Sequence, residues 1–333
     1  MITRFTTLVG CDVPLQQAAI GSLTNPELAS AVSNAGALGM VCVYGMPPDG
    51  IAEILGATRA RTPGPVGANF ILNFMDPASL HDCVASAARS ARVVEFFYSD
   101  PDPRLVQVAH SGGALVSWQV GSPDEARAAA GAGCDLIVAQ GVEAGGHVRG
   151  RTGLIPLLDA VLEAVPDIPV LAAGGIGSGR AMAAALACGA DGVRVGTRFV
   201  ASTEAGAHPR YVDALIAAGP EDTLLSDTFN ANWSNAPHRC LRASVEAAIA
   251  CTDEFVAEVE DEETGEIFRI RRLGSFTPRA AVRGNIAAMP HWAGESVGNV
   301  RRVQGAAEIV RELADDCERR LGRGAPSGAT SRS

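Results

Sequence analysis

The sequence contains no lysine, and all 27 of its basic residues are arginine. Schiff-base catalysis, pyridoxal-phosphate attachment and the Walker A loop all need a lysine amine, so these chemistries are excluded. The net charge is −10 and the pI is about 5.1, which argues against binding to a nucleic-acid backbone or an anionic membrane. We therefore expect a small molecule as the partner, with no nucleic acid and no membrane.

Metal-site and export signals are also missing. The eight cysteines include no C-x-x-C pair, and the six histidines show no H-E-x-x-H spacing, so we predict neither a metal site nor a disulfide framework. The first ten residues lack the apolar stretch of a signal peptide, and no run of about 18 apolar residues occurs. We expect a soluble, cytoplasmic protein with reduced thiols. Four cysteines have small apolar neighbours and are predicted to pack in the core: Cys11, Cys42, Cys134 and Cys188.

Aromatic residues make up only 5% of the chain, whereas 47% of it is hydrophobic. The core must therefore consist of alanine, valine, leucine and isoleucine, as in buried parallel strands and the helices that cover them. Short apolar runs alternate with helical segments whose starts are marked at Asn25, Ser122 and Ser178. Eight such units predict an α/β fold, a (β/α)8 TIM barrel with its ligand site at the carboxyl ends of the strands. The predicted strands are Pro14–Ala19, Leu38–Val43, Val66–Phe70, Val93–Phe97, Leu115–Gln119, Leu136–Ala139, Val170–Ala173 and Gly192–Val195.

The alternation of strands and helices stops after about residue 226. We predict a barrel of residues 1–226 and 284–321, a small inserted lid subdomain of residues 227–283, and a disordered tail of residues 322–333. Within the lid, Thr264-Gly265 is expected to turn a hairpin between Glu258–Glu263 and Gly265–Arg272. Val303–Leu321 has apolar residues at helical spacing and is predicted to close the fold.

Two glycine turns follow the last two predicted strands. The first contains Gly174, Gly175 and Gly177 and leads into a helix, where backbone N–H groups and the helix dipole favour an anion. The second, Gly192–Phe199, adds a hydroxyl and basic side chains. Paired turns at this place are typical of a barrel phosphate site. The alternative is two tight turns without a ligand.

The segment after the sixth predicted strand places His147 between glycines. At a barrel mouth its imidazole would move a proton near neutral pH, although alone it would be interpreted as a solvated loop histidine. Gln140 would hydrogen-bond a planar heterocycle. Asn69, at the end of the third strand, is either a turn former or a polar group directed into the mouth, and the same two interpretations apply to Gln16, Gln17, Trp118 and Gln119.

Residues 140–147, Gln-Gly-Val-Glu-Ala-Gly-Gly-His, resemble the Q-G-x-E-A-G-G-H signature of nitronate monooxygenases and of their relatives, the flavin-dependent enoyl-ACP reductases. Further similarity lies in residues 26–39, 172–177, 196–199 and 293–298, so it covers nearly the whole chain. It implies an FMN-binding TIM barrel with a small lid and His147 as the catalytic base. The FMN contacts it implies are Asn69, Gln140, Gly145, Gly175, Arg194, Val195, Gly196 and Thr197, with the phosphate on Gly174–Gly177 and Gly196–Thr197.

The implied reaction is FMN-dependent oxidation of alkyl nitronates or nitroalkanes with O₂. A second reading keeps FMN but reduces it with NAD(P)H and passes hydride to a quinone or an enoyl thioester, with lid arginines on the nucleotide phosphates. A flavin-binding barrel without turnover is a third, and metal-dependent hydrolysis lacks a histidine and aspartate cluster. One departure from the family is Gln17-Ala-Ala-Ile20, where a Q-A-P-M sequence is common. Size and acidic character favour a monomer or a homodimer.

Overall fold

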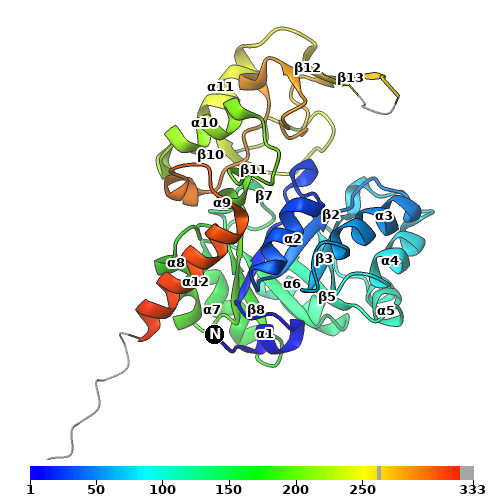
Figure 1. Ribbon diagram of the computed structural model, residues 1–333, viewed down its shortest axis with the longest axis vertical. Coiled ribbons are helices and arrows are strands. Elements are labelled where there is room, and N and C mark those ends of the chain that lie inside the picture. Colours follow the sequence, from blue (N-terminus) through cyan, green and yellow to red (C-terminus); the bar gives the residue numbers. More distant parts are fainter. Residues whose placement is uncertain (261–263, 323–333) are drawn as a thin grey trace, which may run out of the picture.

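A computed structural model describes residues 1–260 and 264–322 of the chain. Eight parallel strands form one sheet in the order β1-β9-β8-β6-β5-β4-β3-β2, and hydrogen bonds between β1 and Leu38, next to β2, join its ends. Gln17 N–H donates to the Leu38 carbonyl and Leu38 N–H donates to the Leu15 carbonyl, each at 2.9 Å. The sheet is therefore a TIM barrel, as predicted (Figure 1). Its strands are β1 (Leu15–Gln17), β2 (Gly39–Cys42), β3 (Val66–Ile71), β4 (Val93–Phe97), β5 (Leu115–Val120), β6 (Leu136–Gln140), β8 (Val170–Ala173) and β9 (Gly192–Val195).

Helices surround the strands and begin where the sequence predicts. The side chains of Asn25, Ser122 and Ser178 each accept a hydrogen bond from the backbone N–H three residues later, which satisfies an otherwise unpaired donor of the first turn. The helices of this ring are α2 (Pro26–Asn34), α3 (Pro48–Arg59), α4 (Leu80–Ala88), α5 (Pro103–Ser111), α6 (Pro123–Gly131), α7 (Leu154–Ala164) and α8 (Gly179–Ala187).

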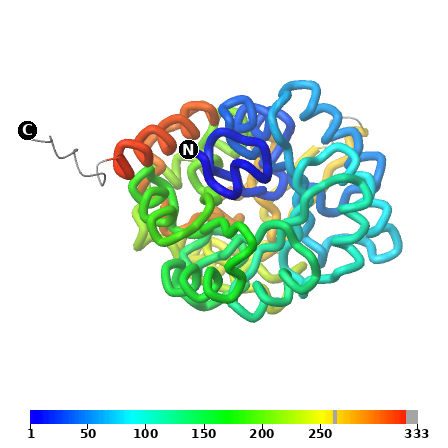
Figure 2. The backbone as a smooth tube through the Cα atoms, turned by 90° about the horizontal axis from the view of Figure 1, so that it is seen from below, coloured from blue at the N-terminus to red at the C-terminus, as the bar shows by residue number. Residues whose placement is uncertain are grey.

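The eighth position of the ring is filled from the end of the chain. Strand β9 is followed only by the four-residue helix α9 (Thr197–Val200). Helix α12 (Ala306–Gly322), close to the predicted closing helix, packs between α8 and α2 (Figure 2). Its apolar side, which includes Ile309, Val310 and Leu313, is buried in the same core as the barrel strands.

The amino-terminal end of the barrel is closed. Helix α1 (Arg4–Val9) buries Phe5 and Val9 in a cluster with Leu38, Met40 and Leu136 from the strands. Since side chains fill this end, the carboxyl ends of the strands are left for a ligand.

Above the carboxyl ends lies a second group of elements with its own apolar cluster around Phe229 and Trp292 (Figure 1). One antiparallel sheet joins β10 (Thr223–Ser226), β11 (His238–Leu241) and β7 (Gly146–His147). Another joins β13 (Ile267–Arg271), β12 (Phe255–Glu260) and β14 (Arg283–Gly284). Helices α10 (Pro209–Ala217) and α11 (Arg242–Ala250) complete this region, which we call the upper region.

The pairing of β12 with β13 confirms a hairpin in the predicted stretch. Residues 261–263, the last three of the predicted stretch Glu258–Glu263, and residues 323–333 of the predicted tail lie outside the described residues. The lid boundaries at 227 and 284 stay a prediction, and β10, which pairs with β11, precedes the first of them.

The four cysteines predicted for the core lie in different surroundings. Cys42 and Cys134 are buried as predicted, whereas Cys11 is half-buried and Cys188 is exposed. The prediction for Cys188 is wrong because its small neighbours mark the end of helix α8 rather than a packed core. Within the described ranges, no helix has the length and apolar character needed to span a bilayer.

Candidate active site

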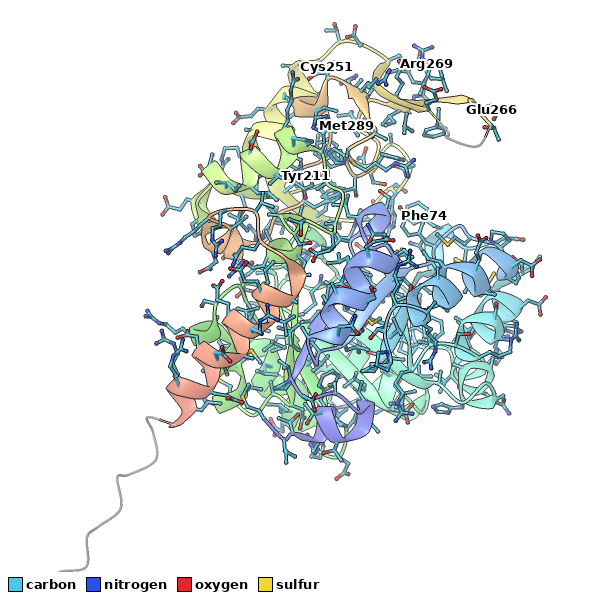
Figure 3. All side chains as sticks on the ribbon, in the orientation of Figure 1. Phe74, Tyr211, Cys251, Glu266, Arg269 and Met289 are labelled. Atoms are coloured by element: carbon cyan, nitrogen blue, oxygen red, sulfur yellow. The ribbon has the colours of Figure 1, made fainter. Side chains whose placement is uncertain are left out.

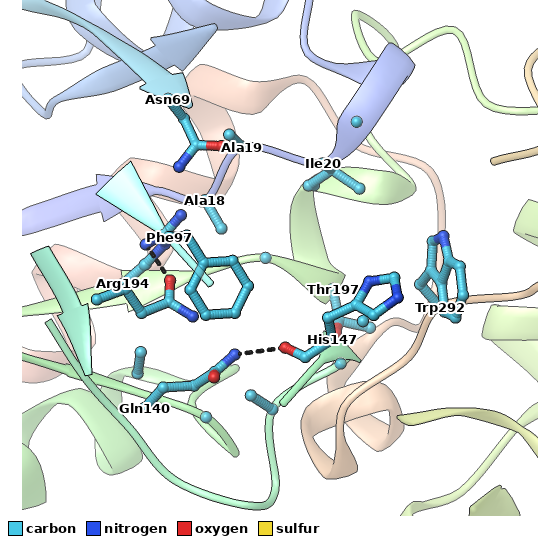
Figure 4. Close-up of a pocket in the computed structure, with 18 of the residues that line it drawn as sticks. Ala18, Ala19, Ile20, Asn69, Phe97, Gln140, His147, Arg194, Thr197 and Trp292 are labelled. Atoms are coloured by element: carbon cyan, nitrogen blue, oxygen red, sulfur yellow. Dashed lines mark hydrogen bonds between the residues drawn. The ribbon is translucent and has the colours of Figure 1, made fainter. Parts of the chain in front are cut away.

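A cavity opens at the carboxyl ends of the barrel strands, beneath the upper region (Figure 4). Its empty volume, including the open mouth, is about 1120 Å³. Most of the site residues named from the sequence line it: Asn69, Gln140, Gly145, His147, Gly174, Gly175, Arg194, Gly196 and Thr197. Residues far apart in the chain thus meet at one place.

Two of the named residues do not line the cavity. Val195 is fully buried in the barrel wall, because side chains alternate along β9 and its neighbour Arg194 takes the inward direction. Gly177 lies behind the turn, where its carbonyl accepts a 2.7 Å hydrogen bond from Arg198. A Cβ at Gly177 would lie 2.9 Å from the Ser296 Cβ, so glycine is needed there for packing.

His147 lies on strand β7, which pairs with β11 of the upper region. Its ring stacks on Trp233 at 3.9 Å between centroids and lies 5.4 Å from both Trp292 and His238. Its Nε2 is buried and has no hydrogen-bond partner among residues 1–260 and 264–322. Burial, with a smaller effect from His238, lowers the pKa of His147 to about 3. The imidazole is therefore neutral at physiological pH, with a lone pair on one of its ring nitrogens, and its pKa lies well below the near-neutral value that we expected from the sequence.

Gln140 holds the segment that carries His147. Its Nε2 donates to the His147 carbonyl at 2.9 Å (dashed line, Figure 4), and its Oε1 accepts from the Arg149 N–H at 3.3 Å. The amide thus bridges the two sides of the loop. Gln140 lines the cavity, but it also fixes the backbone at His147.

The other residues of the signature shape the loop. Both carboxylate oxygens of Glu143 accept from the Leu154 N–H, at 2.9 and 3.0 Å, and cap helix α7. A Cβ on Gly145 would lie 2.4 Å from the Gly294 nitrogen. Gly294 N–H in turn donates to the Thr197 hydroxyl at 3.0 Å. The signature therefore packs against both the returning chain and the turn after β9.

The two glycine turns offer backbone N–H groups, rather than charged side chains, to an anion. Gly174 and Gly175 have φ of 108° and 68°, in the left-handed region that favours glycine. The predicted basic side chain of Arg198 is already engaged by Gln304 at 2.9 Å and by Glu312 at 3.1 Å. An anion here would therefore be bound by backbone N–H groups.

The floor of the cavity contains a charged network that the sequence analysis missed. Glu95 on β4 is fully buried and lies 2.8 Å from Arg194. It also accepts hydrogen bonds from Asn69 at 2.8 Å and from Gln16 at 2.9 Å. Arg194 donates a further hydrogen bond to Gln119. The available signal was one acidic residue inside the apolar run Val93–Phe97.

This network resolves the two interpretations given for Asn69 and Gln119. Both side chains are directed into the barrel mouth, where they line the cavity. Gln16 lies in the layer below them, bonded to Glu95. Trp118 is instead a core residue, and its ring centroid lies 4.8 Å from that of Phe96.

Aromatic side chains from the loops form the upper wall, and the sequence analysis did not assign them. The wall includes Phe74, Trp233 and Trp292, and Figure 3 shows Phe74 between the barrel and the upper region. The only signal was that two of the three tryptophans occur in or just beyond the predicted lid. On another side, Ala18, Ala19 and Ile20 line the cavity, and Ala19 and Ile20 stand where Pro and Met are common in the sequences that the chain resembles (Figure 4).

The family model described as "Nitronate monooxygenase" matches residues 3–316. The chain belongs to the nitronate monooxygenase family. The protein is therefore an oxidoreductase. The Gln140–His147 signature of the family lies at the cavity described above.

Individual relatives carry different names. A (3aS,4S,5R,7aS)-5-hydroxy-7a-methyl-1-oxo-octahydro-1H-indene-4-carboxyl-CoA dehydrogenase of Mycobacterium tuberculosis is 31% identical, with 85% of this chain and 78% of the relative covered. A nitronate monooxygenase of Paraburkholderia phytofirmans is also 31% identical, with 92% of each covered. The chain spans 66% and 60% of two further relatives that are 34% identical to it. Among solved structures, FabK from Thermotoga maritima has a TM-score of 0.80 at 29% identity, with 97% of this chain and 98% of FabK covered.

Proposed function

We propose that this protein is an FMN-dependent enzyme that oxidises alkyl nitronates, or nitroalkanes after deprotonation, with His147 as the base. The observation that carries the proposal is the position of His147: it lines a cavity bounded by two glycine turns, and its buried Nε2 has no hydrogen-bond partner in the described part of the chain. An imidazole at the edge of a ligand pocket is placed to remove a proton from the carbon of a bound substrate. Relatives named nitronate monooxygenase support the same reaction.

The polar groups around the cavity support FMN as the cofactor. Gly174 and Gly175 leave their backbone open toward the cavity, and the Thr197 hydroxyl and the amides near Gly196 lie beside them. These groups would hold the phosphate, while Asn69, Gln140 and Arg194 would face the ring system. When bound, FMN would accept electrons from the nitronate and return them to O₂.

The protein's own part in the reaction is proton transfer and positioning. His147 would take the proton from the carbon that bears the nitro group, and Gln140 would keep the His147 backbone in place through its 2.9 Å hydrogen bond. The aromatic wall would exclude bulk water from Nε2. A substrate that enters already as the nitronate has lost this proton and does not need the base.

The experiment that tests this role compares two forms of one substrate in a His147→Asn variant. With the neutral nitroalkane, kcat/KM should fall by about 10²–10⁴-fold, the usual contribution of a general base. With the pre-formed nitronate, the loss should be much smaller. Equal, full activity of the variant on both forms would refute the assignment of His147.

A second candidate is an FMN-dependent reductase that takes hydride from NAD(P)H and delivers it to a quinone or an enoyl thioester. It is favoured by the relative named as a dehydrogenase of a carboxyl-CoA compound and by the similarity to FabK. Rapid, nitronate-independent bleaching of bound flavin by NADPH would select this candidate. Oligomeric state, monomer or homodimer, and cytoplasmic location remain predictions from the sequence.

A further inference from the structure

The loop between β10 and β11 places an indole directly on the proposed base. The Trp233 and His147 rings are 3.9 Å apart and 28° from parallel. Trp233 also meets Phe74 and Tyr98 edge-on, at 4.9 and 4.7 Å between ring centroids. It is only 6% exposed. Three rings therefore fix the position of the indole.

The loop that carries Trp233 is itself anchored. His238 accepts from the Phe229 N–H at 3.1 Å through Nε2 and bonds the Ala236 carbonyl at 3.0 Å through Nδ1. This pairing uses both ring nitrogens in the neutral form. Ala231 N–H donates to the Leu273 carbonyl at 3.0 Å. The indole is thus held by the fold and is not a side chain that merely rests in an open pocket.

We propose that Trp233 is a specificity-determining residue, whose indole limits the substrate to narrow, unbranched primary nitroalkanes and nitronates and shields His147 from water. The inference rests on the proposed function of the site. A neutral imidazole accepts a proton in the plane of its ring, so the reacting carbon must approach along that plane, beside the stacked indole. A branch or an aryl group on this carbon would clash with the indole, whereas an unbranched alkyl chain would fit beside it.

The charged and titratable groups near His147 have a smaller effect on its pKa than burial, to which the indole contributes. His238 faces it from β11, and burial lowers the pKa of His238 too. Tyr98 faces it 6.1 Å away, with a pKa raised by burial. Arg149, near Tyr98, is paired with Glu125 at 2.6 Å and Asp100 at 2.7 Å. Burial is the larger cause of the low His147 pKa, so removal of the indole should raise it.

The first test compares kcat/KM for an unbranched nitronate, that of 1-nitropropane, with that for the nitronate of phenylnitromethane. In Trp233→Ala the ratio of the aryl to the unbranched substrate should rise by about tenfold or more, the range expected when a pocket wall is removed. Trp233→Phe should give an intermediate ratio. Trp118→Phe is the matched control, because Trp118 is a buried indole outside the cavity lining. It should lower Tm without changing the ratio. An unchanged ratio in folded Trp233→Ala would overturn the inference.

The second test follows the His147 imidazole by NMR during a pH titration of the purified enzyme. In Trp233→Ala the His147 pKa should move upward toward 6.5 from the low value that burial sets, whereas Trp118→Phe should leave it unchanged. An unmoved pKa would contradict the shielding role. The titration does not need turnover. If the proposed function is wrong, the enzyme will lack nitronate activity, but the titration will still show whether Trp233 shields His147.

Discussion

At the scale of single residues, Glu95 shows how the barrel floor holds a charge. Its carboxylate is fully buried, yet it is surrounded by Arg194, Asn69 and Gln16 at 2.8–2.9 Å. A buried charge of this kind is tolerated because each partner compensates part of its lost hydration. Removal of one partner leaves the other without compensation. The network should therefore respond strongly to single substitutions.

We predict that Glu95→Gln lowers the free energy of unfolding by about 3 kcal/mol, since Arg194 would remain buried without its counter-charge. The expected measurement is urea unfolding at pH 7. The same variant should bind FMN more weakly, because Asn69 and Arg194 would lose the group that orients them.

The matched control is Glu254→Gln, which removes the carboxylate of an ion pair with Arg271 at 3.0 Å. Both side chains of this pair are mostly exposed, so the loss should be below about 1 kcal/mol. Equal effects of the two variants would show that burial does not decide the strength of these pairs.

At the scale of structural elements, the loop from β6 to β7 joins the barrel to the upper region. Gly145 and the returning chain at Gly294 are in backbone contact, and Thr197 bonds the same point. Even one added methyl group has no room there. The position of the β6–β7 loop is therefore set by close packing of its backbone.

Gly145→Ala should therefore distort the loop and lower both Tm and FMN affinity, because its Cβ would lie 2.4 Å from the Gly294 nitrogen. Gly131→Ala provides a control near the end of α6, where a new Cβ would meet nothing within 4 Å. That change should leave FMN affinity intact and keep or raise Tm, since alanine favours a helix. Calorimetry and flavin fluorescence titration measure both quantities. A normal FMN affinity in Gly145→Ala would contradict this account of the loop.

The elements of the barrel were predictable because parallel buried strands and capped helices leave local signals. Short runs rich in apolar or β-branched residues predicted all eight strands, and Asn25, Ser122 and Ser178 marked helix starts. Side-chain partners across strands leave no such signal. Glu95 and Trp233 were missed because their roles arise from contacts with residues far away in the sequence.

At the scale of the whole molecule, the cavity is formed by two groups of elements together. The barrel provides its floor and glycine turns, while the upper region provides Trp233 and the strand that pairs with His147. Periodicity showed that the pattern changes after about residue 226, but it could not show that β11 would pair with β7. Long-range pairing depends on the assembled fold, which single-sequence patterns do not encode.

Buried histidines should make the whole molecule less stable in mild acid. Burial lowers the pKa of His147 to about 3, that of His291 to about 4, and that of His238 as well. The unfolded chain binds these protons near pH 6.5, so it gains protons that the folded chain does not. Stability is therefore full only well above pH 6.5 and falls as the pH drops toward 4, by up to about 2 kcal/mol between pH 7 and 5 for each of His147 and His291.

Urea unfolding at pH 7 and pH 5 measures this loss. His291→Asn, which removes one of these groups, should reduce the loss of stability between pH 7 and pH 5 by up to about 2 kcal/mol. An equal pH dependence in the variant and the parent would show that His291 does not contribute.

The central claim, an FMN enzyme for nitronates, is tested most directly by an anaerobic visible spectrum of the purified protein supplied with FMN. We predict a bound flavin band that bleaches on addition of an alkyl nitronate alone. Absence of flavin binding would contradict both candidate functions. A bound flavin that nitronate leaves oxidised, but that NADPH bleaches rapidly, would contradict nitronate oxidation and select the reductase.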